Sequence, residues 1–182
     1  MQQLVFYGAL ATGKIWRPQV VLRVEDPDGK VLQAYEPEVR GQLEIKKSTR
    51  DTVLKGLLAA VNQPYGTGYG VRPKDFVAAG KTGTAQVVKM GATRLKAAQV
   101  DYFERDHAWF ATFAPVDDPQ IAIAVLSEHA GEHGGTVAAP MAQQVMERYF
   151  TRGAPTVPLP PATIPPPTTE AHATRSPPHH PL

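Results

Sequence analysis

Two apolar runs separated by a short turn constrain the fold of this chain more than any other feature of its sequence. The runs are His107–Ala114 and 120–127, and the turn between them is Pro115-Val-Asp-Asp-Pro119. Each run has the length of a β-strand, and proline and aspartate are typical of a connecting turn. Because the second run is apolar at both odd and even positions, both of its faces are expected to be covered. The sequence therefore predicts an antiparallel hairpin.

The N-terminal part is predicted to hold one helix and a second hairpin. Residues 2–12 carry apolar side chains at helical spacing and are followed by Gly13, a common helix terminator. Residues 15–24 are strand-like, and 30–35 are expected to return antiparallel to them across the turn Asp26-Pro-Asp-Gly29.

Two further helices are predicted from apolar stripes. Ser48-Thr-Arg-Asp51 fits the capping-box pattern of a helix start, and the helix is expected to end near Asn62. The final helix follows a glycine-rich loop at 131–135. The two stripes, both predicted to be core, are Val53, Leu54, Leu57, Leu58 and Val61, and then Met141, Ala142, Val145, Met146 and Tyr149.

The segment 77–88 is predicted to be a strand that carries the chemistry of the chain. It contains Lys81-Thr-Gly-Thr-Ala-Gln86, so a cation, two hydroxyls and a glycine lie close together. Such a strand suits a substrate with a carboxylate and a peptide bond. We expect residues 81–88 to form a central strand beside His107–Ala114. The complete order predicts an α+β fold, in which an antiparallel sheet is flanked by helices.

Three other interpretations of the polar motifs are weaker. A phosphate-binding loop would need a glycine five residues before Gly80, where the chain has Asp75. Lys81 could instead be a solvated lysine on an edge strand. His129, Glu132 and His133 could bind a metal, but the glycines among them disfavour a helix with ligand spacing. We therefore expect neither a metal nor a cofactor.

Composition excludes several classes of function. The 182 residues have a net charge of +2, with no basic block that would bind nucleic acid, and no cysteine. No targeting or transmembrane segment is apparent. Ten of the eighteen prolines fall in residues 153–182, which we expect to be a disordered tail after a folded domain at 1–152.

Several motifs in this order resemble the penicilloyl serine transferases, and within them class B penicillin-binding proteins of the penicillin-binding protein 2 type. The resemblance covers roughly residues 1–150. The stretches that carry it are Lys81–Gln86, Arg105-Asp-His-Ala-Trp-Phe-Ala-Thr-Phe-Ala-Pro115, Asp118-Pro-Gln-Ile-Ala-Ile-Ala-Val125 and Gly134-Gly-Thr-Val-Ala-Ala-Pro140. The resemblance implies the C-terminal part of a transpeptidase domain with a β-lactamase-like fold.

This resemblance also implies roles for four residues. Lys81 would lie beside the nucleophilic serine and assist proton transfer and carboxylate binding. The hydroxyls of Thr82 and Thr84 would receive the carboxylate of a D-Ala-D-Ala stem peptide or a β-lactam. Gly83 would let the acyl group approach the strand, and the Thr84 N–H would donate to the oxyanion.

The nucleophile itself is missing from the 182 residues. The family uses Ser-x-x-Lys and Ser-x-Asn ahead of the Lys-Thr-Gly strand. Ser48, Ser127 and Ser176 have neither lysine three residues on nor asparagine two residues on. We therefore expect the chain to be a fragment that begins after these motifs.

The sequence is compatible with three functions. The first is penicillin binding and peptidoglycan D,D-transpeptidation by a longer parent protein at the periplasmic face of the inner membrane. That parent would have a membrane glycosyltransferase of the elongation machinery as its partner. The second is a β-lactamase or D,D-carboxypeptidase relative, and the third is an inert or partner-binding fragment.

Overall fold

The computed structural model describes residues 1–89 and 96–152, which fall into two compact units. Val21–Tyr35 belong to one unit, and the described residues on either side of them belong to the other. The predicted tail at 153–182 lies outside the described residues, as do residues 90–95.

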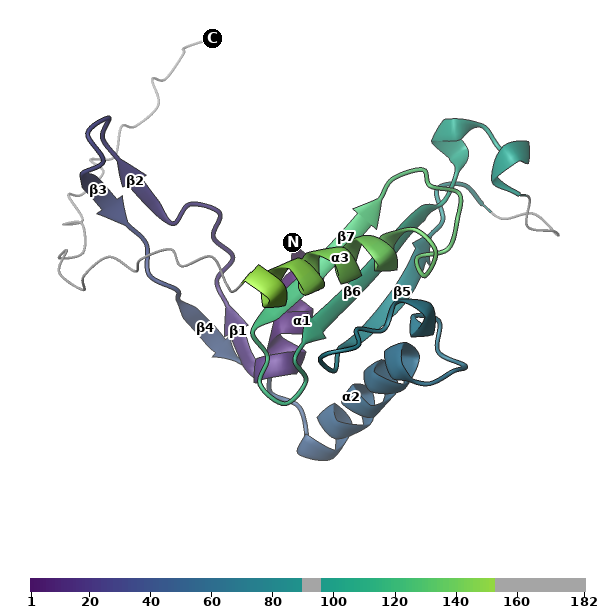
Figure 1. Cartoon of the computed structure of the whole chain (residues 1–182), viewed down its shortest axis with the longest axis horizontal. Coiled ribbons are helices and arrows are strands. Elements are labelled where there is room, and N and C mark those ends of the chain that lie inside the picture. The colour runs from purple at the N-terminus through teal and green to yellow at the C-terminus, as the bar shows by residue number, and fades with distance from the viewer. Residues whose placement is uncertain (90–95, 153–182) are drawn as a thin grey trace, which may run out of the picture. The chain divides into compact units, whose positions relative to one another are not determined.

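A three-stranded antiparallel sheet forms the centre of the larger unit (Figure 1). Its strands are β5 (Ala79–Ala85), β6 (His107–Ala114) and β7 (Ile121–Ser127), in the order β5-β6-β7. The predicted hairpin and its pairing with the Lys81 strand are confirmed. The central position predicted for the Lys81 strand is wrong, because β6 has two neighbours whereas β5 pairs only with β6 among the described residues.

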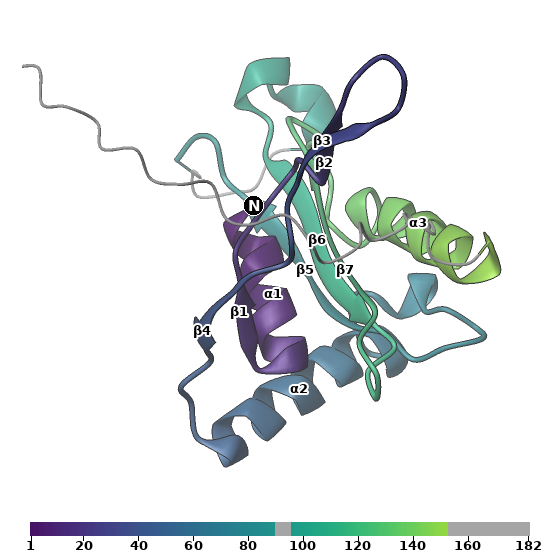
Figure 2. The ribbon, with the colours of Figure 1, turned by 90° about the vertical axis from the view of Figure 1, so that its left-hand side faces the viewer.

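Helices cover both faces of this sheet, which confirms the predicted α+β architecture. α1 (Gln2–Thr12) and α3 (Ala138–Arg152) lie on opposite faces, and α2 (Lys47–Asn62) packs beside β5 (Figure 2). The glycine that ends α1, Gly13, has the left-handed φ of 77° that favours glycine, as the sequence predicted.

The core consists of two clusters, one on each face of the sheet. On the α3 face, Phe110 of β6 packs with Met146 of α3 and Val61 of α2. On the α1 face, Phe113 of β6 packs with Tyr7 and Leu10 of α1, and α2 contributes Leu57. Because α2 supplies residues to both clusters, it fixes the β5 side of the sheet to both helical layers.

Parts of the predicted core are wrong. In α3 the buried residues are Ala138, Ala139, Ala142 and Met146, whereas Met141 and Val145 are about half exposed. Val53 of α2 is also exposed. β7 is covered mainly on the face of Ile121, Ile123 and Val125, and Leu126 on its other face is 59% exposed. A stripe of apolar residues in one helix or strand predicts which of its faces is apolar. How much of that face is buried depends on how widely the neighbouring elements cover it.

The remaining strands are short. β1 (Lys14–Trp16) pairs with β4 (Val39–Gln42) in the larger unit, and β2 (Arg23–Glu25) pairs with β3 (Val31–Ala34) in the smaller one, both antiparallel. The hairpin around Asp26 and Gly29 is thus confirmed. The single strand predicted over 15–24 is wrong, and Pro18, which lacks an N–H to donate, lies in the gap between β1 and β2.

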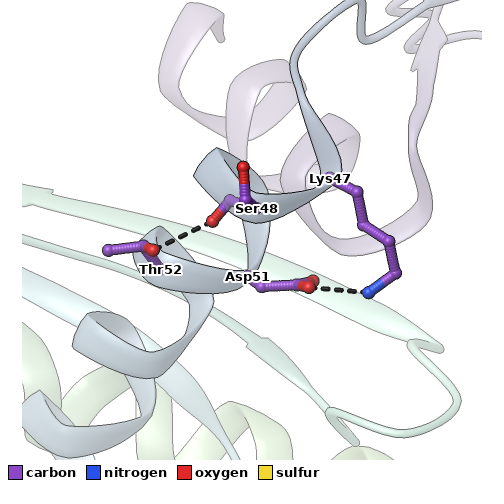
Figure 3. Close-up of polar contacts among 4 residues, drawn as sticks. All are labelled: Lys47, Ser48, Asp51 and Thr52. Carbon is purple, nitrogen blue, oxygen red and sulfur yellow. Dashed lines mark hydrogen bonds and ion pairs between the residues drawn. The ribbon is translucent and has the colours of Figure 1, made fainter.

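The start of α2 differs from the predicted capping box (Figure 3). The helix begins at Lys47, so Ser48 lies inside the first turn, and its carbonyl accepts a hydrogen bond from the Thr52 hydroxyl. Lys47 Nζ instead forms an ion pair with Asp51, at 2.6 Å, which holds the pKa of the Asp51 carboxyl below its ordinary value. The helix therefore begins without a side-chain cap, and its first turn carries an exposed ion pair between residues four apart.

None of the helices in the described part of the chain is long and apolar enough to cross a bilayer.

Candidate functional site

A cation and two hydroxyls meet at the edge of β5 that faces away from β6. The Lys81 ammonium donates to the Thr82 carbonyl at 3.0 Å and to the Thr82 hydroxyl at 3.2 Å. It also lies 3.4 Å from the hydroxyl of Thr67, and the two threonine hydroxyl oxygens are 2.7 Å apart. Lys81 and Thr67 are exposed and Thr82 is half-buried, so the group is open to a ligand.

Thr67 belongs to the glycine-rich loop at 65–70, which is attached to the end of α2. The N–H of Gly68 donates to the Ala60 carbonyl at 2.8 Å, and the N–H of Gly66 donates to the Gln63 carbonyl at 2.8 Å. A Cβ at Gly66 would overlap the carbonyls of the last turn of α2. Glycine thus allows the loop to lie directly on the helix end, which places Thr67 beside β5.

A second glycine-rich loop, Gly134-Gly135, lies against the same part of β5. A Cβ at Gly134 would approach the Gly83 carbonyl oxygen to 2.7 Å and would overlap the carbonyl of Trp109. A Cβ at Gly135 would overlap the carbonyl of Thr67. The Gly134 carbonyl then accepts from the N–H of Ala139 at 2.8 Å, in the first turn of α3. The start of α3 and the end of α2 therefore both meet the edge strand at its Lys-Thr-Gly segment.

The absence of a side chain at Gly83 leaves room for the side chain of Trp109. It lies opposite Trp109 of β6, and a Cβ at Gly83 would fall inside the Trp109 indole ring. The indole also packs against the core cluster on the α1 face. The structure thus gives Gly83 a packing role, in addition to the close approach of a substrate that the sequence predicts.

Thr84 follows on the same strand, opposite Ala108, and is half-buried. In an antiparallel strand, backbone groups alternate between the two edges, and β5 has no second strand neighbour in the described chain. Half of its N–H and C=O groups therefore point away from β6. This is the backbone edge on which the family resemblance implies an oxyanion donor.

The histidines considered as metal ligands do not gather with acidic residues. His129 stacks edge to face on His107, with ring centroids 4.6 Å apart, and its backbone N–H donates to His107 Nδ1 at 2.9 Å. The rings of Tyr102 and Phe103 also contact His129. Within the described ranges, no group of three metal-ligating side chains is present. This cluster is an aromatic connection between the loop before β6 and the loop after β7.

Neither described serine lies within reach of Lys81. Ser127 pairs with Ala108, which in turn pairs with Thr84, so Ser127 is two strands away from β5, about 10 Å. Ser48 lies in the first turn of α2, about 20 Å from the end of the helix that contacts β5. Ser176 lies outside the described residues.

Sequence reasoning located Lys81, Thr82, Gly83 and Thr84 on one strand, and it missed Thr67 and Trp109. The available signal for Thr67 was its place between two glycines, Gly66 and Gly68. No sequence pattern indicated that Trp109 would lie opposite Gly83.

Comparison with known proteins shows the family of the chain. A family model described as the penicillin binding protein transpeptidase domain matches residues 1–147. Peptidoglycan D,D-transpeptidase MrdA of Haemophilus influenzae is 33% identical over 152 residues, which are 80% of this chain and 22% of that protein. Stage V sporulation protein D of Bacillus subtilis is 31% identical over 144 residues, 76% of this chain and 20% of that relative.

Solved structures give the same result. The crystal structure of Pseudomonas aeruginosa PBP2 in complex with WCK 5153 aligns with a TM-score of 0.58 and 32% identity, over 79% of this chain and 28% of that one. The D,D-transpeptidase domain of a peptidoglycan glycosyltransferase from Eggerthella lenta aligns with a TM-score of 0.61 and 26% identity, over 82% of this chain and 31% of that domain. The chain spans about a fifth of the length of the curated relatives that it matches.

Proposed function

We propose a function for this chain from one premise, that it belongs to the penicillin binding protein transpeptidase domain family. It supplies the Lys-Thr-Gly strand of a serine D,D-transpeptidase, which cross-links peptidoglycan by acyl transfer from D-Ala-D-Ala stem peptides and which β-lactams acylate. The observation that carries the proposal is the set of donors at the β5 edge, where the Lys81 ammonium and the Thr67 and Thr82 hydroxyls converge.

Each donor has a chemical role in this reaction. The stem peptide and a β-lactam both present a carboxylate, and a cation with hydroxyl donors binds that group through charge-assisted hydrogen bonds. Lys81 and Thr82 form this receiving group, and the Thr84 hydroxyl extends it along the strand. The outward backbone N–H at Thr84 is aimed at the carbonyl oxygen on which negative charge develops during acylation. Lys81 also lowers the cost of removing a proton from a serine placed beside it.

The nucleophile of this reaction must come from a Ser-x-x-Lys segment, and residues 1–182 contain none. The chain by itself should therefore form no penicilloyl adduct. A protein in which residues 1–147 replace the matching stretch of Haemophilus influenzae MrdA would combine both halves of the site.

The experiment measures the rate at which this chimera is acylated by fluorescent penicillin, with intact mass to count adducts. We expect one adduct per chimera and none on the 182-residue chain. Lys81→Ala should slow acylation by at least about a hundredfold, within the range found for removing one group that stabilises the transition state. The matched control is Lys55→Ala, since Lys55 is an exposed lysine of α2 outside the site. A folded chimera that does not react, or an unchanged rate in Lys81→Ala, would overturn the proposal.

The location and partner follow from the same premise. We propose that the acting protein works at the periplasmic face of the inner membrane, where its substrate is assembled, together with a membrane glycosyltransferase that makes the glycan strands. Co-purification of that glycosyltransferase with the longer protein, and its absence with a chain limited to 1–182, would support the assignment.

A further inference from the structure

The contacts at the β5 edge assign a role to Thr67, which lies outside the Lys-Thr-Gly motif. We propose that Thr67 is a positioning residue, whose hydroxyl orients Thr82 and Lys81 so that the site presents one hydroxyl proton and one ammonium to a substrate carboxylate. The inference rests on the proposed function in one respect, because it takes a carboxylate as the ligand.

The Thr67–Thr82 pair has one hydroxyl proton more than it uses internally. The Thr67 and Thr82 hydroxyls are 2.7 Å apart, so one of them donates to the other. Two hydroxyls have two protons, and the pair uses one of them internally. The second proton has no acceptor among the described residues, and it can point to a ligand. Without Thr67, the Thr82 hydroxyl would have no neighbouring hydroxyl to fix its direction.

The Lys81 ammonium polarises the two hydroxyls. Its ammonium lies 3.2 Å from the Thr82 hydroxyl and 3.4 Å from that of Thr67, so both oxygens face a positive charge. An oxygen that accepts from a cation becomes a better donor through its own proton. The hydroxyl pair is therefore polarised toward an anion. The hydroxyl pair also holds the flexible Lys81 side chain over the strand edge. Less side-chain entropy is therefore lost when a ligand binds.

The loop that carries Thr67 is held in place by contacts within the chain. Its loop is attached to α2 through the Gly68 N–H bond to Ala60, and a Cβ at Gly135 would overlap the Thr67 carbonyl. Thr67 itself is exposed, so it contributes little packing to the core. Its position at the site is thus explained by its hydroxyl and not by burial.

The test is binding of acetyl-D-alanyl-D-alanine to the full 182-residue chain, followed by amide chemical shifts in NMR spectra. The wild type should bind saturably, with shifts at Thr67, Lys81 and Thr82. Thr67→Val keeps the shape and removes the hydroxyl, and it should weaken binding about three- to tenfold, as expected for one hydrogen bond. Thr67→Ser keeps the hydroxyl and should bind like the wild type.

Two controls separate positioning from general damage. Thr52→Val removes an exposed hydroxyl that bonds to the Ser48 carbonyl near the start of α2, outside the Lys81 cluster, and should leave binding unchanged. Acetyl-D-alanyl-D-alaninamide lacks the carboxylate, so it should bind to the wild type more weakly than the acid does. Its affinity should be the same for the wild type and for Thr67→Val. Unchanged β6 amide shifts show that a variant is folded, and Thr67→Ala is a second variant without the hydroxyl should Thr67→Val fail this check.

Equal affinities of the wild type and Thr67→Val would overturn the inference. So would a Thr67→Ser variant as weak as Thr67→Val, or a folded wild type that does not bind the dipeptide. None of these results would affect the proposed function, since acylation of the chimera is measured separately and depends on a serine outside this chain.

Discussion

Gly83→Ala tests the packing of the Lys-Thr-Gly strand against Trp109. The new methyl group would fall inside the indole ring, so the ring must move out of its place against the α1-face cluster. Overpacking of this kind costs about 1–3 kcal/mol. Alanine regains about 0.5–1 kcal/mol over glycine in a strand, because it has less conformational entropy to lose. The net loss in the free energy of unfolding should therefore be about 1 kcal/mol.

The matched control is Gly41→Ala in β4, where a Cβ would meet nothing within 4 Å. This variant should show only the increase in stability that alanine gives over glycine. The free energies of unfolding of the two variants should therefore differ by about 1–3 kcal/mol, measured by urea unfolding followed by circular dichroism. In a Trp109→Leu background the indole is absent, and Gly83→Ala should then behave like the control. Equal stabilities of Gly83→Ala and Gly41→Ala, or a difference that persists without the indole, would refute the packing argument.

Other substitutions test the helix start and the core. Ser48→Ala should change the free energy of unfolding by less than about 0.5 kcal/mol, because Ser48 is not the helix cap, whereas loss of a capping serine costs about 1 kcal/mol. Asp51 has a folded pKa below its ordinary value of 3.8, so its ion pair stabilises the fold above that pH. This contribution should be lost as the pH falls through the lowered pKa, and Asp51→Asn should flatten the acid limb of the stability curve. Phe110→Ala should cost about 3–5 kcal/mol, because Phe110 is 1% exposed, whereas Leu126→Ala should cost less than about 0.5 kcal/mol in the same thermal or urea unfolding experiment.

The sequence predicted the sheet because local signals for β6 and β7 agree. Each strand has a continuous apolar run, and the proline-bounded turn between them leaves only the hairpin pairing. The position of β5 at an edge depends on which strands are present elsewhere, and no local pattern contains that information. For the same reason, the apolar stripe of α3 predicted a helix correctly while Met141 and Val145 on it are exposed.

The residues of the candidate site were predictable only where they are contiguous. Lys81, Thr82, Gly83 and Thr84 form one short motif on one strand, so their proximity follows from the chain itself. Thr67 is fourteen residues before Lys81, and it reaches the strand because two glycine-rich loops pack closely against α2 and β5. Such an approach depends on tertiary packing, which a glycine permits but does not specify.

The geometry also restricts where the missing nucleophile can lie. β5 has β6 on one side and packs against α2, while α1 and α3 cover the two faces of the sheet over β6 and β7 (Figure 2). Lys81, Thr82 and the outward backbone groups of β5 all meet at the opposite edge, next to the Thr67 loop. A serine must come within about 3 Å of its base and of the oxyanion donor to act. In the proposed transpeptidase, the element that carries the Ser-x-x-Lys motif must therefore lie along the edge of β5 that faces away from β6. The carboxylate site and the nucleophile would then lie on either side of the same substrate. Removing the Thr67 hydroxyl should therefore weaken binding of the carboxylate more than it changes the reactivity of the serine.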